Sequence, residues 1–141
     1  MKKTLKLYRP VGKKEMELIA ESDFKAYPPR LPWQPIFYPV MNFEYAAQIA
    51  KEWNTPSEQS GYCGFVTAFE VDADYASKFD VQNVGGFEHN ELWIPSEELA
   101  EFNQHIIGKI EVLAAFYGEK YIGDTPQYMD LKNGFSVNYN D

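Results

Sequence analysis

Polar side chains stand at the ends of apolar, strand-like segments, where they could line a cleft. Arg9 closes the alternating segment 5–9 and directly precedes Pro10. A guanidinium is a planar fork that suits phosphate or carboxylate, and it keeps its charge at any physiological pH. This pattern predicts either a ligand-binding cation or a surface arginine paired with a nearby carboxylate.

Glu91 opens a second candidate segment, residues 91–94, after a glycine-containing turn at 85–90. A carboxylate behind such a turn can face a cleft, where it would stabilise developing positive charge or orient a hydroxyl group. The alternative is a solvated glutamate at a strand edge. His89 lies beside it and either tunes that carboxylate or simply belongs to the turn.

Aromatic residues gather around the start of a predicted helix. Phe37 and Tyr38 belong to the apolar segment 36–40, and Tyr45 follows shortly after it. Aromatic faces can hold a flat heterocycle, although such residues also fill cores. Cys63 lies on the apolar face of the alternating segment 62–71, which predicts a buried, inert thiol rather than a nucleophile.

The motifs that would define an activity by themselves are absent from the sequence. It contains no phosphate-binding G-x-x-x-x-G-K, no G-x-G-x-x-G, no H-E-x-x-H and no G-x-S-x-G. Two histidines and one cysteine are too few for a zinc set. We therefore expect no bound metal, and the chemistry must be inferred from the candidate residues above.

Composition restricts the class of protein. A chain of 141 residues, 45% of them hydrophobic, fits one domain with a substantial core. The net charge of −8 disfavours nucleic acid but suits a basic protein partner. The single cysteine is typical of a reducing compartment, and no apolar run approaches the ~20 residues of a membrane span. We expect a cytoplasmic protein without membrane contact.

Periodicity predicts a mixture of strands and helices. Helices are expected at 13–22, at 42–54 with Asn42 as N-cap, at 72–79, and at 96–106 between Ser96 and Gly108. Strands are expected at 5–9, 36–40, 62–71, 81–84, 91–94 and 109–117, and the proline-rich segment 27–35 should be an extended loop. The order lacks regular βαβ alternation, so the fold class should be α+β. Residues 1–118 form the predicted domain, and 119–141 an appendage packed on it or used for contacts.

Several blocks of residues carry a family resemblance: residues 7–12 (LYRPVG) with the helix from 15 to 19, residues 28–32 (PPRLP), residues 34–40 (QPIFYPV), residues 44–46 (EYA), and residues 91–99 (ELWIPSEEL) with those up to 108. Their order resembles the ADP-ribosyltransferase-like superfamily. It is closer still to short bacterial proteins labelled "ADP-ribosylation/crystallin". The resemblance covers roughly residues 5–118.

The resemblance implies a split, curved, mostly antiparallel β-sheet core with flanking helices around an NAD cleft. In that arrangement Arg9 would contact the dinucleotide, and Phe37 or Tyr38 would occupy the second motif. Tyr45 would stack on nicotinamide. Glu91 would hold the nicotinamide ribose and favour loss of nicotinamide through an oxocarbenium-like state.

The chain also departs from the superfamily pattern. It has no Ser-Thr-Ser in the second motif, and His89 stands where arginine-modifying members have Glu or Gln two residues before the catalytic glutamate. These differences favour an NAD cleft over transfer to a protein.

Three hypotheses follow. The first is an NAD-binding, ADP-ribosyltransferase-like protein that cleaves NAD to nicotinamide and transfers ADP-ribose, or a glycohydrolase. The second is a catalytically inactive acidic binding module, such as a toxin inhibitor, that uses its acidic surface or the tail 119–141. The third is a structural domain or homodimer. The enzyme hypothesis requires Arg9, Tyr45 and Glu91 to line one pocket.

Overall fold

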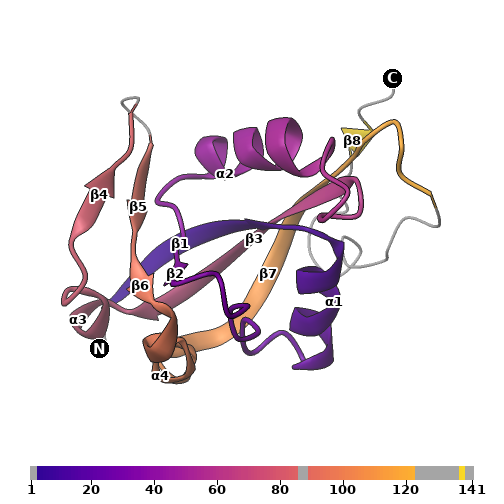
Figure 1. Ribbon diagram of the computed structural model, residues 1–141. Coiled ribbons are helices and arrows are strands. Elements are labelled where there is room, and N and C mark those ends of the chain that lie inside the picture. The colour runs from indigo at the N-terminus through magenta and orange to yellow at the C-terminus, as the bar shows by residue number, and fades with distance from the viewer. Residues whose placement is uncertain (1–2, 86–88, 123–136, 139–141) are drawn as a thin grey trace.

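The computed structural model describes residues 3–85, 89–122 and 137–138. Its main sheet is long and mostly antiparallel. Its strand order is β1-β3-β7-β8. β1 (Thr4–Val11) and β7 (Ile106–Tyr117) pair antiparallel with the two edges of β3 (Cys63–Asp72). The short β8 (Val137–Asn138) pairs parallel with the end of β7. Figure 1 shows these strands running side by side through the molecule.

A second group of strands lies beyond β1. β2 (Ile36–Phe37) pairs with β6 (Ile94–Pro95), and β4 (Val81–Asn83) pairs with β5 (Asn90–Leu92), both antiparallel. Two isolated bridges, Tyr8 with Val40 and Val40 with Glu91, connect this group to β1. The contact between the two groups is therefore narrow, and it lies close to Arg9 and Glu91.

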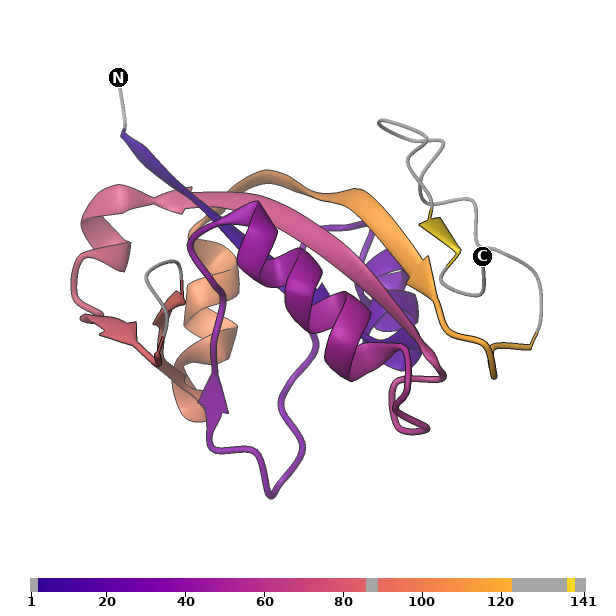
Figure 2. The ribbon, with the colours of Figure 1, turned by 90° about the horizontal axis from the view of Figure 1, so that it is seen from above.

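Four α-helices lie within the described residues. They are α1 (Lys13–Glu21), α2 (Phe43–Ile49), α3 (Ala73–Ala76) and α4 (Leu99–Gln104). A π-helical turn (Ala50–Asn54) extends α2, and a 3₁₀ turn (Ser96–Glu98) precedes α4. α1 and α2 lie on opposite sides of the main sheet (Figure 1), and Figure 2 shows α2 lying along the β1–β3 side. The mixed α+β class is confirmed.

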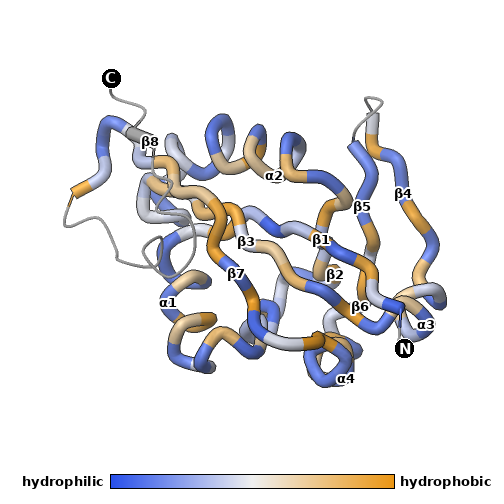
Figure 3. Tube along the Cα trace, turned by 180° about the vertical axis from the view of Figure 1, so that it is seen from behind, coloured by the Kyte–Doolittle hydropathy of each residue, from blue (hydrophilic) through white to orange (hydrophobic). Residues whose placement is uncertain are grey.

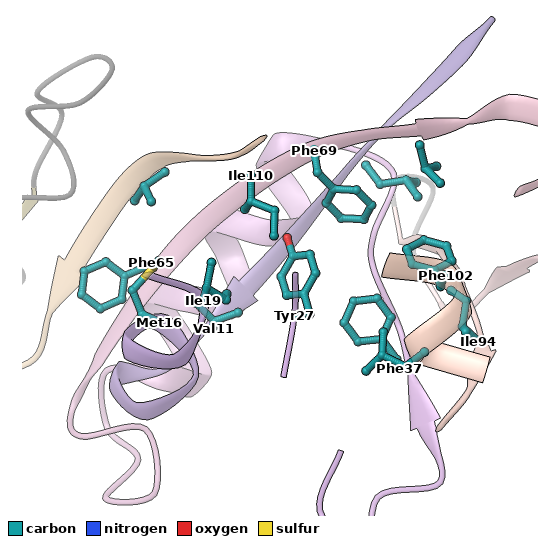
Figure 4. Packing of buried hydrophobic residues seen from close by; sticks show 14 of the residues in the cluster. Val11, Met16, Ile19, Tyr27, Phe37, Phe65, Phe69, Ile94, Phe102 and Ile110 are labelled. Carbon is teal, nitrogen blue, oxygen red and sulfur yellow. The ribbon is translucent and has the colours of Figure 1, made fainter. Parts of the chain in front are cut away.

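The apolar pattern places the core on both faces of β3. Phe65, Phe69 and Val71 pack with Met16 and Ile19 of α1 on one face. On the other face, Val66 packs against alanines of α2. The alternation of segment 62–71 indicates one apolar face, but both faces of β3 are covered because β3 is a central strand of the sheet. Figure 3 shows hydrophobic stretches along β3 and β7, and Figure 4 shows the larger cluster from close by.

Proline and helix-capping signals misplaced some boundaries. β1 continues through Pro10. The nitrogen of Pro10 faces the same edge of β1 as the Tyr8 N–H, and beyond the isolated bridge from Tyr8 to Val40 this edge has no strand partner among the described residues, so the missing N–H of proline breaks no hydrogen bond of the sheet. Ser96 is not a side-chain cap, since it begins the 3₁₀ turn before α4. Asn42 is a cap as predicted, and its Oδ1 accepts a hydrogen bond from the Tyr45 N–H at 2.7 Å.

Gly108 was predicted to end the helix that follows Ser96, but it lies inside β7. Its φ of 74° is a left-handed conformation that favours glycine, and it coincides with an irregularity in the pairing of β3 with β7. Of the predicted appendage 119–141, residues 123–136 and 139–141 lie outside the described residues.

Candidate functional site

A pocket of about 500 Å³ opens where β1 ends and α1 begins. Its walls come from residues 9–12 and the first turns of α1, from the proline-rich segment 28–34, from Tyr38, and from Ile49, Asn54, Gln59 and Ser60. This volume lies within the ~300–1,000 Å³ of typical small-molecule sites. We call it the Arg9 pocket.

The local sequence explains how the walls are held. Prolines 28, 29, 32 and 35 restrict the backbone of the 27–35 segment, which is not extended throughout as predicted but turns at Leu31–Gln34, where the Gln34 N–H donates to the Leu31 carbonyl at 2.8 Å. The Arg30 Nε donates to the Ile36 carbonyl at 3.0 Å. At the start of α1, Gly12 lies so close to Ser60 that a Cβ would be 2.7 Å from the Ser60 Cα. The Lys13 N–H donates to the Ser60 carbonyl there at 2.9 Å. Glycine therefore permits the close approach that closes one end of the pocket.

Arg9 lies in the wall of the pocket and is only 4% exposed. Its Nε and Nη2 donate to the two carboxylate oxygens of Glu15, at 2.7 and 3.1 Å. The guanidinium lies 4.7 Å from the ring centroid of Phe37 and 5.4 Å from that of Tyr38. The sequence left a paired arginine or a ligand-binding cation as alternatives, and the structure gives a paired but buried arginine.

The two arginines of the chain, Arg9 and Arg30, both line this pocket. Lys14 also lines it, and Glu15 is the one acidic residue among the lining residues. Burial lowers the pKa of Arg30, and the neighbouring charge of Arg9 lowers it further, although Glu15 partly opposes this. A chain with a net charge of −8 thus has a locally cationic pocket.

Two exposed rings stand beside these cations. Trp33 is 73% exposed and Tyr38 is 36% exposed, and both line the pocket. Large rings left in water beside cationic groups offer stacking surface for a flat, anionic ligand. Phe37, by contrast, is fully buried among the core aromatics, so it supports Arg9 from beneath without reaching the pocket.

Glu91 belongs to a separate polar cluster. Its side chain is buried, at 6% exposure. The Tyr45 hydroxyl donates to its Oε2 at 2.9 Å, and the Trp93 Nε1 donates to its Oε1 at 2.7 Å. Burial raises the pKa of Tyr45, and the hydrogen bond and charge of Glu91 raise it further, so the hydroxyl remains a donor. Each carboxylate oxygen already has a protein donor.

His89 lies on the same cluster. Its ring stacks on Tyr45 with centroids 4.4 Å apart and an interplanar angle of 18°. A ring nitrogen, Nε2, lies 3.2 Å from the Gln48 Oε1, within hydrogen-bonding distance. His89 therefore packs on the Tyr45 ring and contacts α2.

The backbone register directs the Arg9 and Glu91 side chains to opposite faces. Tyr8 is bridged to Val40, and Val40 to Glu91. Residues opposite one another in antiparallel pairs share a face, and successive residues of a strand alternate. Tyr8, Val40 and Glu91 therefore share the α2 face, whereas Arg9, one residue after Tyr8, projects from the α1 face.

The structure thus divides the predicted site residues into two sets. Arg9 and Tyr38 line the Arg9 pocket, while Tyr45, His89 and Glu91 form the cluster on the α2 face. Neither Tyr45 nor Glu91 is among the lining residues of the pocket, so the single shared pocket expected from the resemblance is not observed.

Sequence reasoning missed the parts of the pocket that lie in the proline-rich segment. The sequence predicts only an extended loop for residues 27–35, whereas Arg30 and Trp33 of this loop line the pocket. One signal could have identified Arg30: it is the second of two arginines in an otherwise lysine-rich set of cations.

Among the residues that the structure describes, no three histidine, cysteine or acidic side chains gather as metal ligands. Cys63 is fully buried, as predicted, and burial raises the pKa of its thiol to about 11. In the same described ranges, no helix combines the length and apolar character needed to cross a membrane.

Comparison of this chain with protein-family models, with curated proteins and with solved structures finds no match.

Proposed function

We propose that this domain binds NAD or a related nucleotide in the Arg9 pocket and acts as a nucleotide-binding module. One observation carries the proposal. Both arginines of an acidic chain lie in one 500 Å³ pocket, beside the exposed rings of Trp33 and Tyr38.

The chemistry of the lining supports this class of ligand. A guanidinium fork matches phosphate oxygens, and Arg is the cation best suited to bidentate recognition of them. An exposed indole or phenol ring offers a face for a base, and stacking of this kind is worth ~1–3 kcal/mol per base. A nucleotide combines an anionic group with a flat heterocycle, so it uses both features of the pocket.

The arrangement of the strands supports the finer fold proposal. Among the described residues, the strand pairing between the β1-β3-β7 sheet and the β2–β6 and β4–β5 pairs is limited to the isolated bridges at Val40. A split sheet of this kind is what the resemblance to the ADP-ribosyltransferase-like superfamily implies. The Arg9 pocket lies beside the junction of the two groups of strands, and Arg9 in its wall is the residue to which the resemblance assigns contact with the dinucleotide.

We favour binding over cleavage of NAD because of the position of Glu91. A glutamate that stabilises a forming cation must face the pocket in which that cation forms. The Glu91 oxygens accept hydrogen bonds from Tyr45 and Trp93, and its side chain projects to the α2 face. Binding in the Arg9 pocket does not need this carboxylate.

Calorimetric titration with NAD, ADP-ribose and AMP tests the proposal. We expect saturable binding of at least one of them, and Trp33→Ala should weaken it about fivefold or more, because a stacking surface is lost. Trp53→Ala is the matched control: Trp53 is 70% exposed but does not line the pocket. Absence of saturation at millimolar ligand, or equal effects of the two variants, would overturn the proposal.

A nicotinamide-release assay separates binding from cleavage. We expect the wild-type chain to bind without releasing nicotinamide. Release from the wild-type protein that is lost in a Glu91→Gln variant shown to be folded by thermal unfolding would replace the binding module with an NAD-cleaving enzyme.

A further inference from the structure

Arg30 is the guanidinium of the Arg9 pocket that has no acidic partner among the described residues. Arg9 uses its Nε and Nη2 on Glu15. Arg30 donates from Nε to the Ile36 carbonyl, and the ion pairs of the described residues do not include it. This leaves the Nη groups of Arg30, in a pocket wall, available to an external anion.

The charges of the pocket do not balance. Arg9, Arg30 and Lys14 line it together with a single carboxylate, Glu15. Glu15 is bound in a bidentate manner by Arg9, the most buried of these cations, so both of its oxygens are already held by Arg9. The surplus of two positive charges corresponds to the charge of a phosphate monoester, which is about −1.5 to −2 near pH 7.

The first turn of α1 adds to this surplus. Gly12 precedes the helix and provides no side-chain cap, and Gly12, Lys14 and Glu15 all line the pocket. Uncapped N–H groups and the helix dipole favour an anion at such an end. On its own a helix end would identify nothing, but here it faces the same pocket as the unpaired Arg30.

We infer that Arg30 is the anchor for a phosphate group of the bound ligand, and that Glu15 is the resident counter-ion of Arg9 that limits how tightly the phosphate is held. The inference rests on the proposed nucleotide function, and it names the group of the ligand that the pocket recognises. Arg9 then acts as a positioning residue, since its guanidinium is held by Glu15 and packs on Phe37 and Tyr38.

The same geometry implies that Glu15 sets the affinity of the pocket for the phosphate group of the ligand. Its carboxylate carries a negative charge at the pocket wall, next to Arg9 and electrostatically coupled to Arg30. A phosphate that approaches Arg30 is repelled by this charge. Removing the charge while keeping an amide oxygen for Arg9 should therefore strengthen phosphate binding without rebuilding the wall.

The test compares AMP with adenosine by calorimetry on the full chain. We expect AMP to bind at least about tenfold more tightly than adenosine, as a charge-assisted hydrogen bond implies. Arg30→Gln should remove this difference, because AMP then loses a contact to its phosphate group that adenosine never makes. Glu15→Gln should strengthen AMP binding about fivefold, which is the effect of one unit charge about 4 Å away in a water-like dielectric.

Glu17→Gln is the matched control for Glu15, because it makes the same charge change on α1 at a residue that does not line the pocket. Thermal unfolding of each variant checks that it folds, and the Arg30→Gln comparison stands even if Glu15→Gln does not fold.

The outcomes separate the two proposals. Equal affinity for AMP and adenosine in the wild-type chain, or an AMP preference that persists in Arg30→Gln, would overturn the phosphate anchor and leave the nucleotide proposal standing. Weaker or unchanged AMP binding in a folded Glu15→Gln would overturn the role of Glu15. If neither AMP nor adenosine binds, while NAD and ADP-ribose also fail, both proposals fall.

Discussion

Replacing Tyr45 by phenylalanine removes one hydroxyl from the cluster around Glu91 and leaves the ring in place. The Tyr45 hydroxyl donates to the Glu91 Oε2 at 2.9 Å, and the Trp93 Nε1 donates to the other oxygen. Phenylalanine keeps the stacking surface for His89 but leaves Oε2 without this donor. The variant therefore isolates a single hydrogen bond to a buried carboxylate.

The magnitude follows from the burial of Glu91, which is 6% exposed. A hydrogen bond to a charged group contributes ~1.5–3 kcal/mol, and a buried acceptor left without a donor loses its solvation as well. Tyr45 itself is half-buried, so water can reach its side of the bond and the lower part of the range applies. We expect a loss of about 1.5–2 kcal/mol in the free energy of unfolding.

Urea unfolding at neutral pH, followed by circular dichroism, measures this loss. Tyr62→Phe provides the control: Tyr62 is also half-buried, but its hydroxyl makes no hydrogen bond within the described part of the chain. Its removal should change stability by less than about 0.5 kcal/mol, as for ordinary surface positions.

If Tyr45→Phe were no more destabilising than Tyr62→Phe, the Glu91 carboxylate would not depend on this donor. The assignment of Glu91 to a structural cluster would then lose its basis, and a carboxylate free to face a ligand would become the better interpretation.

Two further predictions concern the sheet. Gly118→Ala should cost about 3 kcal/mol, because a Cβ there would overlap the backbone carbonyl of Thr55. Gly108→Ala meets no atom within 4 Å and should cost only the ~1–2 kcal/mol of an alanine held at a left-handed φ of 74°; equal urea midpoints for the two variants would contradict this. Cys63 should react slowly with a thiol reagent at pH 8 until urea unfolds the chain, because its pKa is raised to about 11 by burial. Labelling of the folded chain within minutes would refute the burial argument. Because the pKa of Cys63 is raised in the folded state, the associated stability is fully present below the unfolded value of ~8.5 and is lost as pH rises towards 11.

Much of the fold could be predicted from local patterns. Alternation identified β3 and most of β1 and β7, and helical spacing identified α1 and α2 with the Asn42 cap. The failures at Gly108 and at Pro10 have one cause. Each residue is a strong local signal for termination, but pairing with β3 continues β1 and β7 past it, because the ladder hydrogen bonds are set by the neighbouring strand.

The candidate site was less predictable. The residue types around Arg9 and Tyr38 pointed to a cationic, aromatic site, and both line the pocket. The contribution of the 28–34 segment was not evident, because a proline-rich loop has no periodicity that tells which side chains face inward. The division between Arg9 and Glu91 depends on register, and a shift of one residue would reverse it.

The sequence by itself determined which segments become strands and helices, and that an apolar core of ordinary size would form, because burial and backbone periodicity act locally along the chain. The tertiary structure alone decided which charges meet. Arg9 and Arg30 are distant in sequence yet share a pocket, while Glu91 is joined to β1 through Val40 and faces away from Arg9. The reason is that strand pairing over long sequence separations, and not the identity of the residues, assigns each side chain to a face.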